Sequence, residues 1–185
     1  MRHAVLSVLL VQSLCIAPAC SGNAQRVEVI KATTAENDAK PNSNAVPDVY
    51  ALSGQFERIL ILRLKHDVDL LPGLEREIKR LGIQNAVLLS GIGSVRGYHV
   101  HTVSNRSFPS RNVYVKDPLA PADIQAMNGY VIDGRVHAHV VLSNPEHSFG
   151  GHLEPETRVF TFAIITLGVL KQGLDLSRLD DKTHR

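Results

Sequence analysis

Histidine is the residue type whose number and spacing in this sequence most clearly point to chemistry. Nine histidines occur, and six of them lie between His99 and His152. His137 and His139 are separated by one residue, and His152 follows directly after Gly150-Gly151. Neutral imidazole is a common ligand of zinc and related divalent ions. These histidines therefore form a candidate metal site.

The spacing of the three residues suits shared ligation. Side chains two residues apart on a strand point to the same face, about 6.5–7 Å apart. A hairpin through Gly150 and Gly151, which permit close backbone approach, would bring His152 beside His137 and His139. Because zinc–nitrogen bonds are about 2.0–2.1 Å, the ring nitrogens should then lie within about 3–4 Å of one another. We expect three imidazoles with an open coordination position, and zinc as the first candidate. The alternative is that the histidines are solvent-facing or hydrogen-bonded and structural.

Other polar residues are assigned to the surroundings of this site. His99 and His101 repeat the same spacing on another expected strand and are interpreted as a surface pair or as pocket lining. Glu154 and Glu156 could act as general bases or could hydrogen-bond to the ligands, although ordinary solvated hairpin residues are the simpler interpretation. His147 stands in a turn and is expected to be exposed. The candidate pocket comprises His99, His101, Gly150, Gly151 and Glu156.

Other catalytic patterns are weak. The segment Ser90–Gly97 (SGIGSVRG) lacks the Gly-Lys-Ser/Thr of a phosphate-binding loop, and no helix is expected after it. A glycine bend between two buried strands is the preferred interpretation. No serine stands in a nucleophile elbow. The sequence leaves open whether the chain is an enzyme.

The elements that must hold these residues are one early helix and a series of strands. Apolar residues recur at three- and four-residue steps over Leu71–Leu81, which indicates a helix with one apolar stripe, and Gly82 is a typical stop signal. The segment Ser143–Gly151 is expected to be a turn-rich connection. Strands are predicted at 56–64, 83–93, 97–104, 113–115, 124–132, 136–142 and 159–169. The predicted class is α+β, an antiparallel-rich mixed β-sheet with one principal helix packed on it.

Composition indicates one globular domain with an aliphatic core. Hydrophobic residues make up 44% of the 185 residues, aromatic residues only 5%, and tryptophan is absent. Twenty basic and eighteen acidic side chains give a net charge of +2. Proteins that coat duplex DNA usually carry a strong basic excess, because phosphate contacts supply most of their affinity. This chain has no such excess.

The first 24 residues have the pattern of a secretory signal peptide. Arg2 precedes an apolar run over Ala4–Ile16, which is too short for a membrane span and is followed by small residues. We therefore expect export to the periplasm or cell envelope. Cleavage after Ala24 would remove both cysteines, Cys15 and Cys20. Cleavage before Cys20 would instead give a lipid-anchored protein.

The rest of the chain divides into three parts. Residues 25–49 are rich in Ala, Asn, Thr, Lys and Pro, which predicts a flexible linker without internal fold. The folded domain is expected over 50–176, and 177–185 is a polar tail. No segment after the signal peptide is long and apolar enough to be a transmembrane helix.

These patterns resemble the PPC (plant and prokaryote conserved) domain. The resemblance is carried by Gly134–Asn144 (GRVHAHVVLSN), Gly150–Leu153 (GGHL) and the β-rich Thr157–Leu170, with Ser90–Ser94 (SGIGS) upstream. Plant members accompany AT-hook DNA-binding proteins, whereas bacterial and archaeal members stand alone, are often labelled DNA-binding and form trimers. The resemblance implies an α+β fold, a homotrimer and a metal site formed by His137, His139 and His152.

Two features separate this chain from the plant members. It lacks the Arg-Gly-Arg-Pro AT-hook that would enter an A·T minor groove, and an export signal would keep it away from the chromosome. The first hypothesis is therefore an exported, trimeric module that binds a divalent metal, with room for a small ligand or metal-assisted chemistry. The alternative is a DNA-binding or protein-interaction module in which the histidines are structural.

Overall fold

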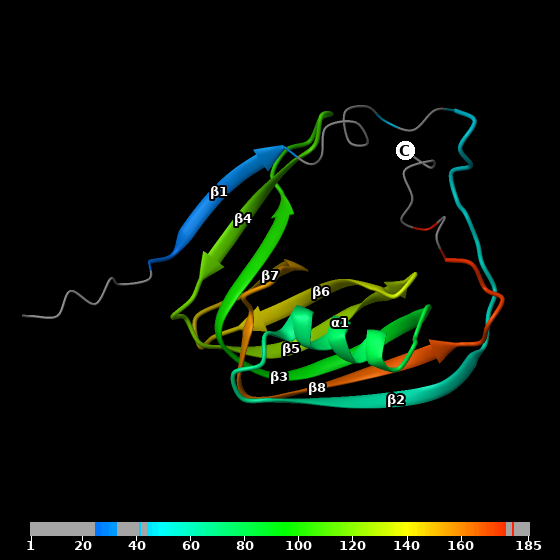
Figure 1. Ribbon diagram of the computed structural model, residues 1–185. Helices are drawn as coiled ribbons and strands as arrows, with labels where there is room; N and C mark the ends of the chain where they lie inside the picture. The colour runs from blue at the N-terminus through cyan, green and yellow to red at the C-terminus, as the bar shows by residue number, and fades with distance from the viewer. Residues whose placement is uncertain (1–24, 33–40, 42–43, 177–178, 180–185) are drawn as a thin grey trace, which may run out of the picture.

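Eight strands and one helix form the part of the chain that the structure describes (Figure 1). This computed structural model describes residues 25–32, 41, 44–176 and 179. The expected signal peptide and nearly all of the expected polar tail lie outside these residues. The elements are β1 (Val27–Ala32), β2 (Phe56–Lys65), α1 (Leu70–Arg80), β3 (Ala86–Val103), β4 (Arg111–Asp117), β5 (Ala122–Ile132), β6 (Arg135–Ser143), β7 (Ser148–Leu153) and β8 (Arg158–Leu170).

The strands of the described chain form one sheet in which the pairings are antiparallel. Strand β3 is its centre: it pairs with β8 and β5 near its start, and with β4 and β7 near its end. Strand β8 continues to β2, and β5 continues through β6 to β7. The antiparallel-rich α+β class predicted from the sequence is confirmed.

Strand β3 runs without interruption through the glycine-rich segment Ser90–Gly97. The sequence predicts two strands there, separated by a glycine bend, and this detail is wrong. The register between β3 and β8 shifts at Leu88/Ser90 and again around Val95. Such bulges bend a strand and increase its twist without ending its pairing, so the glycines curve one long strand.

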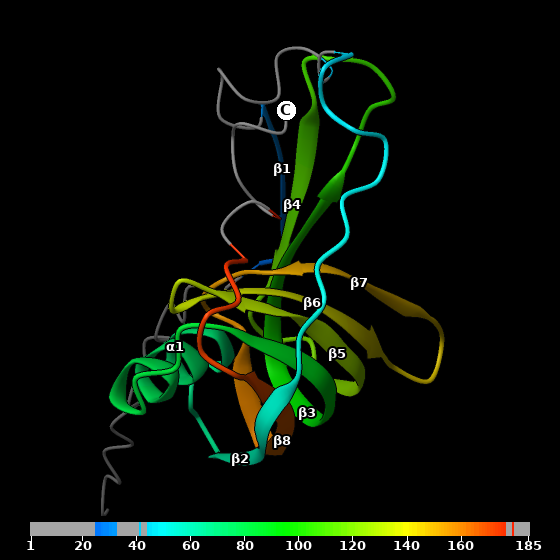
Figure 2. The ribbon, with the colours of Figure 1, turned by 90° about the vertical axis from the view of Figure 1, so that its right-hand side faces the viewer.

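The second half of β3 forms an arm with β4 and β1. Figures 1 and 2 show these three strands extending away from the layer that contains β2, β8 and α1. Residues Val27–Ala32 pair with Arg111–Lys116 in regular antiparallel register. The expectation of a linker without internal fold is therefore wrong for these residues. The open hydrogen-bonding edge of β4 provides partners that the local composition does not reveal.

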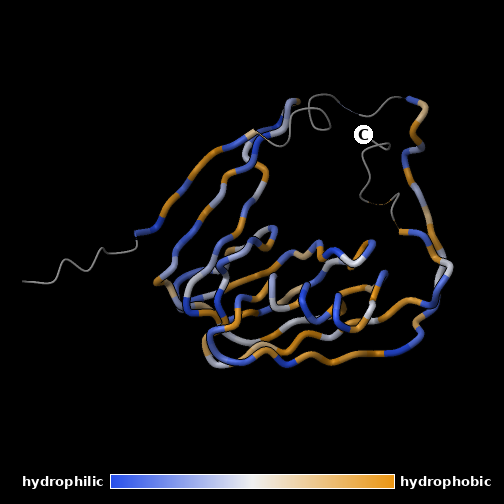
Figure 3. The backbone as a smooth tube through the Cα atoms, viewed as in Figure 1, coloured by the Kyte–Doolittle hydropathy of each residue, from blue (hydrophilic) through white to orange (hydrophobic). Residues whose placement is uncertain are grey.

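Helix α1 covers the core of the domain. Leu74 and Ile78 of the predicted apolar stripe are completely or almost completely buried, and so is Leu70 just before it. Gly82 has a positive φ of 65° directly after the helix, which confirms it as the stop residue. Figure 3 shows hydrophobic residues recurring along α1 and the strands of this layer. Among the described residues, no helix is long and apolar enough to cross a membrane.

Strand β7 lies where the sequence predicts a turn-rich connection. It pairs with β6 over five residue pairs and with β3 over two. Since β3 also pairs with β5, and β5 with β6, the four strands β3, β5, β6 and β7 form a closed circuit of pairings. The segment between β6 and β7 is thus a short hairpin turn, and the circuit brings the ends of β3 and β7 beside the middle of β6.

Candidate metal centre

Strand β6 presents His137 and His139 on one face. Ala138 and Val140 between and beyond them are 1% exposed and belong to the core, so strand alternation turns the two histidines to the opposite face. Their rings are nearly parallel, with an interplanar angle of 11° and centroids 5.8 Å apart. The sequence-predicted pair is therefore placed as expected.

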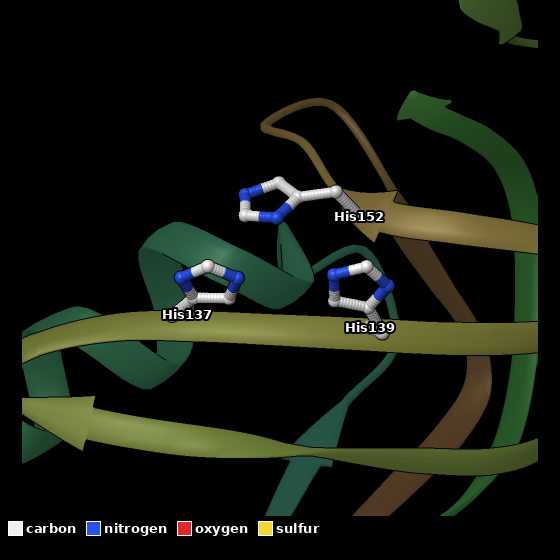
Figure 4. Close-up of side chains that lie close together, drawn as sticks. All are labelled: His137, His139 and His152. Atoms are coloured by element: carbon white, nitrogen blue, oxygen red, sulfur yellow. The ribbon is translucent and has the colours of Figure 1, made fainter. Parts of the chain in front are cut away.

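Strand β7 brings His152 against this pair. His152 is the residue directly opposite His139 in the antiparallel register, and its ring centroid lies 4.8 Å from that of His137 and 5.4 Å from that of His139. Figure 4 shows the three rings grouped on the same side of β6, with His152 reaching over from β7. The structure thus brings together the three residues predicted as ligands.

The glycines before His152 allow β7 to approach its neighbours. A Cβ atom at Gly150 would overlap the carbonyl oxygen of Val140 on β6, and one at Gly151 would overlap the carbonyl oxygen of His101 on β3. Glycine is the residue that such close backbone approach requires. The two glycines predicted as part of the site therefore act through the backbone.

The donor atoms of the three histidines are close enough to converge on one ion. One ring nitrogen from each of His137, His139 and His152 lies within 4.8 Å of the others. Shared zinc ligation places the nitrogens about 3–4 Å apart, a separation that lies within this upper bound. Three imidazoles leave a fourth position of a tetrahedral ion available.

The surroundings of His139 favour its neutral form. Loss of hydration lowers the pKa of His139 below its ordinary value, and positive charge on His137 or His101 would lower it further. A neutral imidazole has a free lone pair, which is the form that binds a metal. The electrostatics of the site therefore favour ligation.

A second group of donors adjoins the first. His101 on β3 stands opposite His152 in the sheet register, and the two rings stack with centroids 4.5 Å apart. Nδ1 of His101 lies 2.6 Å from Oε1 of Glu154. The three residues His101, His152 and Glu154 offer ligand atoms that lie within 4.8 Å of one another. Sequence spacing assigned His101 to the surroundings and Glu154 to the solvent, whereas the structure places both beside the centre.

The remaining predicted pocket residues lie apart from this group. Nδ1 of His99 is 3.0 Å from the carbonyl oxygen of Pro155, and the backbone N–H of His99 donates to the hydroxyl of Thr157. Thr157 is fully buried and fixes the turn after β7, a role that no sequence motif indicated. Glu156 pairs with Lys116. Glu156 also lines a cleft of about 360 Å³ formed with Asp67, Arg96, Gly97, Lys116, Pro118 and Arg158.

Two further histidines of the described chain, His147 and His66, have local contacts. His147 is exposed, as expected; its backbone N–H donates to Oδ1 of Asn144, and its ring packs against Phe149 with centroids 5.3 Å apart. Nδ1 of His66 contacts the carbonyl oxygen of Phe160. Neither residue takes part in the two donor groups.

Solved structures with the same fold come from archaea and bacteria. A metal-containing protein from Archaeoglobus fulgidus is 22% identical, with a TM-score of 0.58 over 74% of this chain and 96% of its own. A plant- and prokaryote-conserved (PPC) protein from Pyrococcus horikoshii is 24% identical, with a TM-score of 0.55 over 69% and 87%. A protein from Bacteroides thetaiotaomicron described as a "putative DNA binding protein" is 13% identical, with a TM-score of 0.51 over 65% and 83%.

Family comparison agrees with the structural one. No protein with a curated description matches the chain significantly. The sequence profile of the Plants and Prokaryotes Conserved (PCC) domain matches residues 51–171, which is well over half of the chain and includes the three histidines. The chain therefore belongs to the plants and prokaryotes conserved domain family, the PPC family that its sequence resembles.

Proposed function

We propose that this chain binds a divalent metal ion, with zinc as the first candidate, through His137, His139 and His152. The observation that carries the proposal is the convergence of three imidazoles, from two neighbouring strands, to within 4.8 Å. The A. fulgidus protein of the same fold, which is described as metal-containing, supports it. A bound zinc ion would supply a Lewis acid with one open position for a small ligand or for metal-assisted chemistry.

The chain's own residues would hold and orient the ligands. Ala138 and Val140 anchor β6 in the core, so the two β6 histidines cannot turn inward. Gly150 and Gly151 let β7 lie tightly between its neighbours and so fix the position of His152. His139, with its lowered pKa, remains available as a neutral ligand.

We further propose that the protein is exported and forms a homotrimer. Export is supported by the basic start, apolar run and small residues of the first 24 positions. Self-association is supported by exposed apolar side chains on neighbouring strands β2, β3 and β8, because contiguous exposed apolar surface is typical of interaction sites. These side chains are Ile59, Ile61, Ile92, Phe160 and Phe162.

The main competing function is DNA binding. It is supported by the description of the B. thetaiotaomicron protein of the same fold. The balanced charge of the chain and the missing AT-hook argue against it. In this alternative the histidines would be structural, and the purified protein would contain no metal.

Elemental analysis of the purified protein tests the proposal. We expect about one zinc, or a related divalent ion, per chain after purification without chelator, as for a site with three protein ligands. Dialysis against a chelator should remove the ion, and added zinc should restore the same ratio. Protein that contains no metal and does not take up zinc would contradict the proposal. Loss of the leader from protein recovered in the periplasm or envelope fraction tests export.

A further inference from the structure

The three-histidine group does not use all the donors that the sheet brings together. His101, His152 and His139 form a row across three adjacent strands, because His152 stands opposite both other residues in the sheet register. Glu154 follows His152 by two residues, just after the end of β7. It supplies the one carboxylate of the two donor groups. The side chains of His101 and Glu154 are only 17% and 21% exposed.

The contact between His101 and Glu154 prepares the histidine as a ligand. An ionised carboxylate can only accept a hydrogen bond, so Nδ1–H of His101 donates to Oε1 of Glu154 at 2.6 Å. The lone pair of His101 is then on Nε2. Carboxylates that hydrogen-bond to histidines are common at metal sites, where they fix the tautomer and the ring orientation. To ligate an ion itself, as the second position requires, Glu154 would release Nδ1–H and turn its oxygens to the ion.

We propose that His101, His152 and Glu154 form a second position for a divalent cation, which shares His152 with the three-histidine site. The proposal rests on the proposed function only through this shared residue. Two divalent cations a few ångströms apart repel each other strongly, and the neutral imidazole of His152 has one free lone pair, which can bind only one ion. The chain therefore holds one ion at a time, in one of two adjoining positions.

The two positions differ in the ion they prefer. Three imidazoles are neutral and suit zinc, whereas two imidazoles with a carboxylate include a hard oxygen donor that suits manganese or iron(II). The carboxylate also reduces the charge of the bound ion from +2 to +1, which matters for an ion in half-buried surroundings. The second position is thus a site for a harder cation, of the Mn²⁺ or Fe²⁺ class.

Calorimetric titration of the full chain with Zn²⁺ and, separately, Mn²⁺ tests this inference. The variant His137→Ala/His139→Ala should lose zinc affinity by at least about 10- to 100-fold, because loss of a residue that only orients a metal ligand already acts on this scale. It should keep one Mn²⁺ per chain with a Kd close to that of wild type. The variant His101→Phe/Glu154→Gln should show the reverse, since Phe preserves the stacking on His152. His152→Ala should lose both metals, and His147→Ala should lose neither.

The outcomes separate this inference from the proposed function. Wild-type protein that binds zinc but not manganese, or Mn²⁺ binding that survives in His101→Phe/Glu154→Gln, would overturn the second position. Zinc binding that survives in His137→Ala/His139→Ala but is lost in His101→Phe/Glu154→Gln would overturn the three-histidine site instead. The single, nearly isosteric change Glu154→Gln guards against misfolding: it should weaken Mn²⁺ binding about tenfold without changing zinc binding or the far-UV spectrum.

Discussion

Crowding of imidazole rings has a direct chemical consequence at His139. Its ring is surrounded by His137, His152 and His101, and a proton placed there is poorly hydrated and close to other groups that can become positive. The pKa of His139 is lowered from its ordinary 6.5 for this reason. In the metal-free protein, a smaller fraction of His139 is therefore protonated at pH 6.5 than of an isolated histidine.

Zinc binding should consequently weaken as the pH falls, because protons compete with the metal for the imidazole lone pairs. The lowered pKa means that His139 is half protonated only at a pH below 6.5. An NMR titration of the metal-free protein should give a midpoint for His139 below that value, and zinc affinity measured at several pH values should fall on the acid side. A zinc affinity that does not change with pH would contradict ligation by histidine.

Replacing His139 by Ala should remove most of the bound zinc, because two imidazoles alone bind the ion much more weakly than three. His147→Ala is the matched control: His147 is exposed and outside both donor groups, so its metal content should equal that of wild type. Elemental analysis of the two purified variants measures the difference. Equal metal content in both variants would show that the β6 face does not hold the ion.

Sequence spacing predicted the β6 pair and its third partner because the relevant contacts are local. His137 and His139 share a strand face, and His152 returns by a short hairpin. The roles of His101 and Glu154 could not be predicted in the same way. They meet across 53 positions of sequence, through a pairing of β3 with β7 that depends on the whole sheet.

At the scale of elements, the position of β7 depends on two residues without side chains. In Gly151→Ala, the new methyl group would collide with the carbonyl oxygen of His101. We expect the free energy of unfolding to fall by about 1–3 kcal/mol and zinc affinity to fall with it, because His152 moves with β7. Chemical denaturation and zinc titration of the same variant measure the two effects.

Gly173→Ala provides the control for that experiment. Gly173 also has a positive φ, but a Cβ atom there would have open space around it. This variant should show the conformational cost of placing a side chain at a positive φ, about 1–2 kcal/mol, and no change in zinc affinity. A Gly151→Ala variant that retains wild-type zinc affinity would show that close approach of β7 is not needed for the site.

Elements whose sequence pattern lies within the segment itself are predicted more accurately than elements that depend on pairing with distant strands. The stripe of Leu71, Leu74 and Ile78 predicted α1 to within about a turn, since helical periodicity is contained in the segment itself. The alternation in Val27–Ala32 was too short to outweigh the polar composition around it, and only pairing with β4 makes it a strand. The glycine-rich sequence in the middle of β3 predicts a bend between two strands. In the structure, bulges preserve the pairing through these glycines, so β3 is one strand.

At the scale of the whole molecule, the charge balance predicts weak interaction with DNA. The chain has twenty basic and eighteen acidic side chains. Contacts between basic side chains and phosphates supply much of the affinity of both specific and nonspecific DNA binding. We expect no preference for one duplex over scrambled competitors at physiological salt, as measured by fluorescence anisotropy. Tight, sequence-dependent binding under these conditions would favour the DNA-binding alternative.

The closed circuit of β3, β5, β6 and β7 also bears on how often the site opens. Strand β7 is only six residues long, contains two glycines and pairs with β3 over just two positions. Local opening in proteins concentrates in such weakly held segments. An ion bound to His152 ties β7 to its neighbours, so amide hydrogen exchange in Ser148–Leu153 should slow on zinc addition. Exchange in β8, which pairs with β2 and β3 on its two sides, should stay unchanged. The protection of one short strand would then report whether the metal is present.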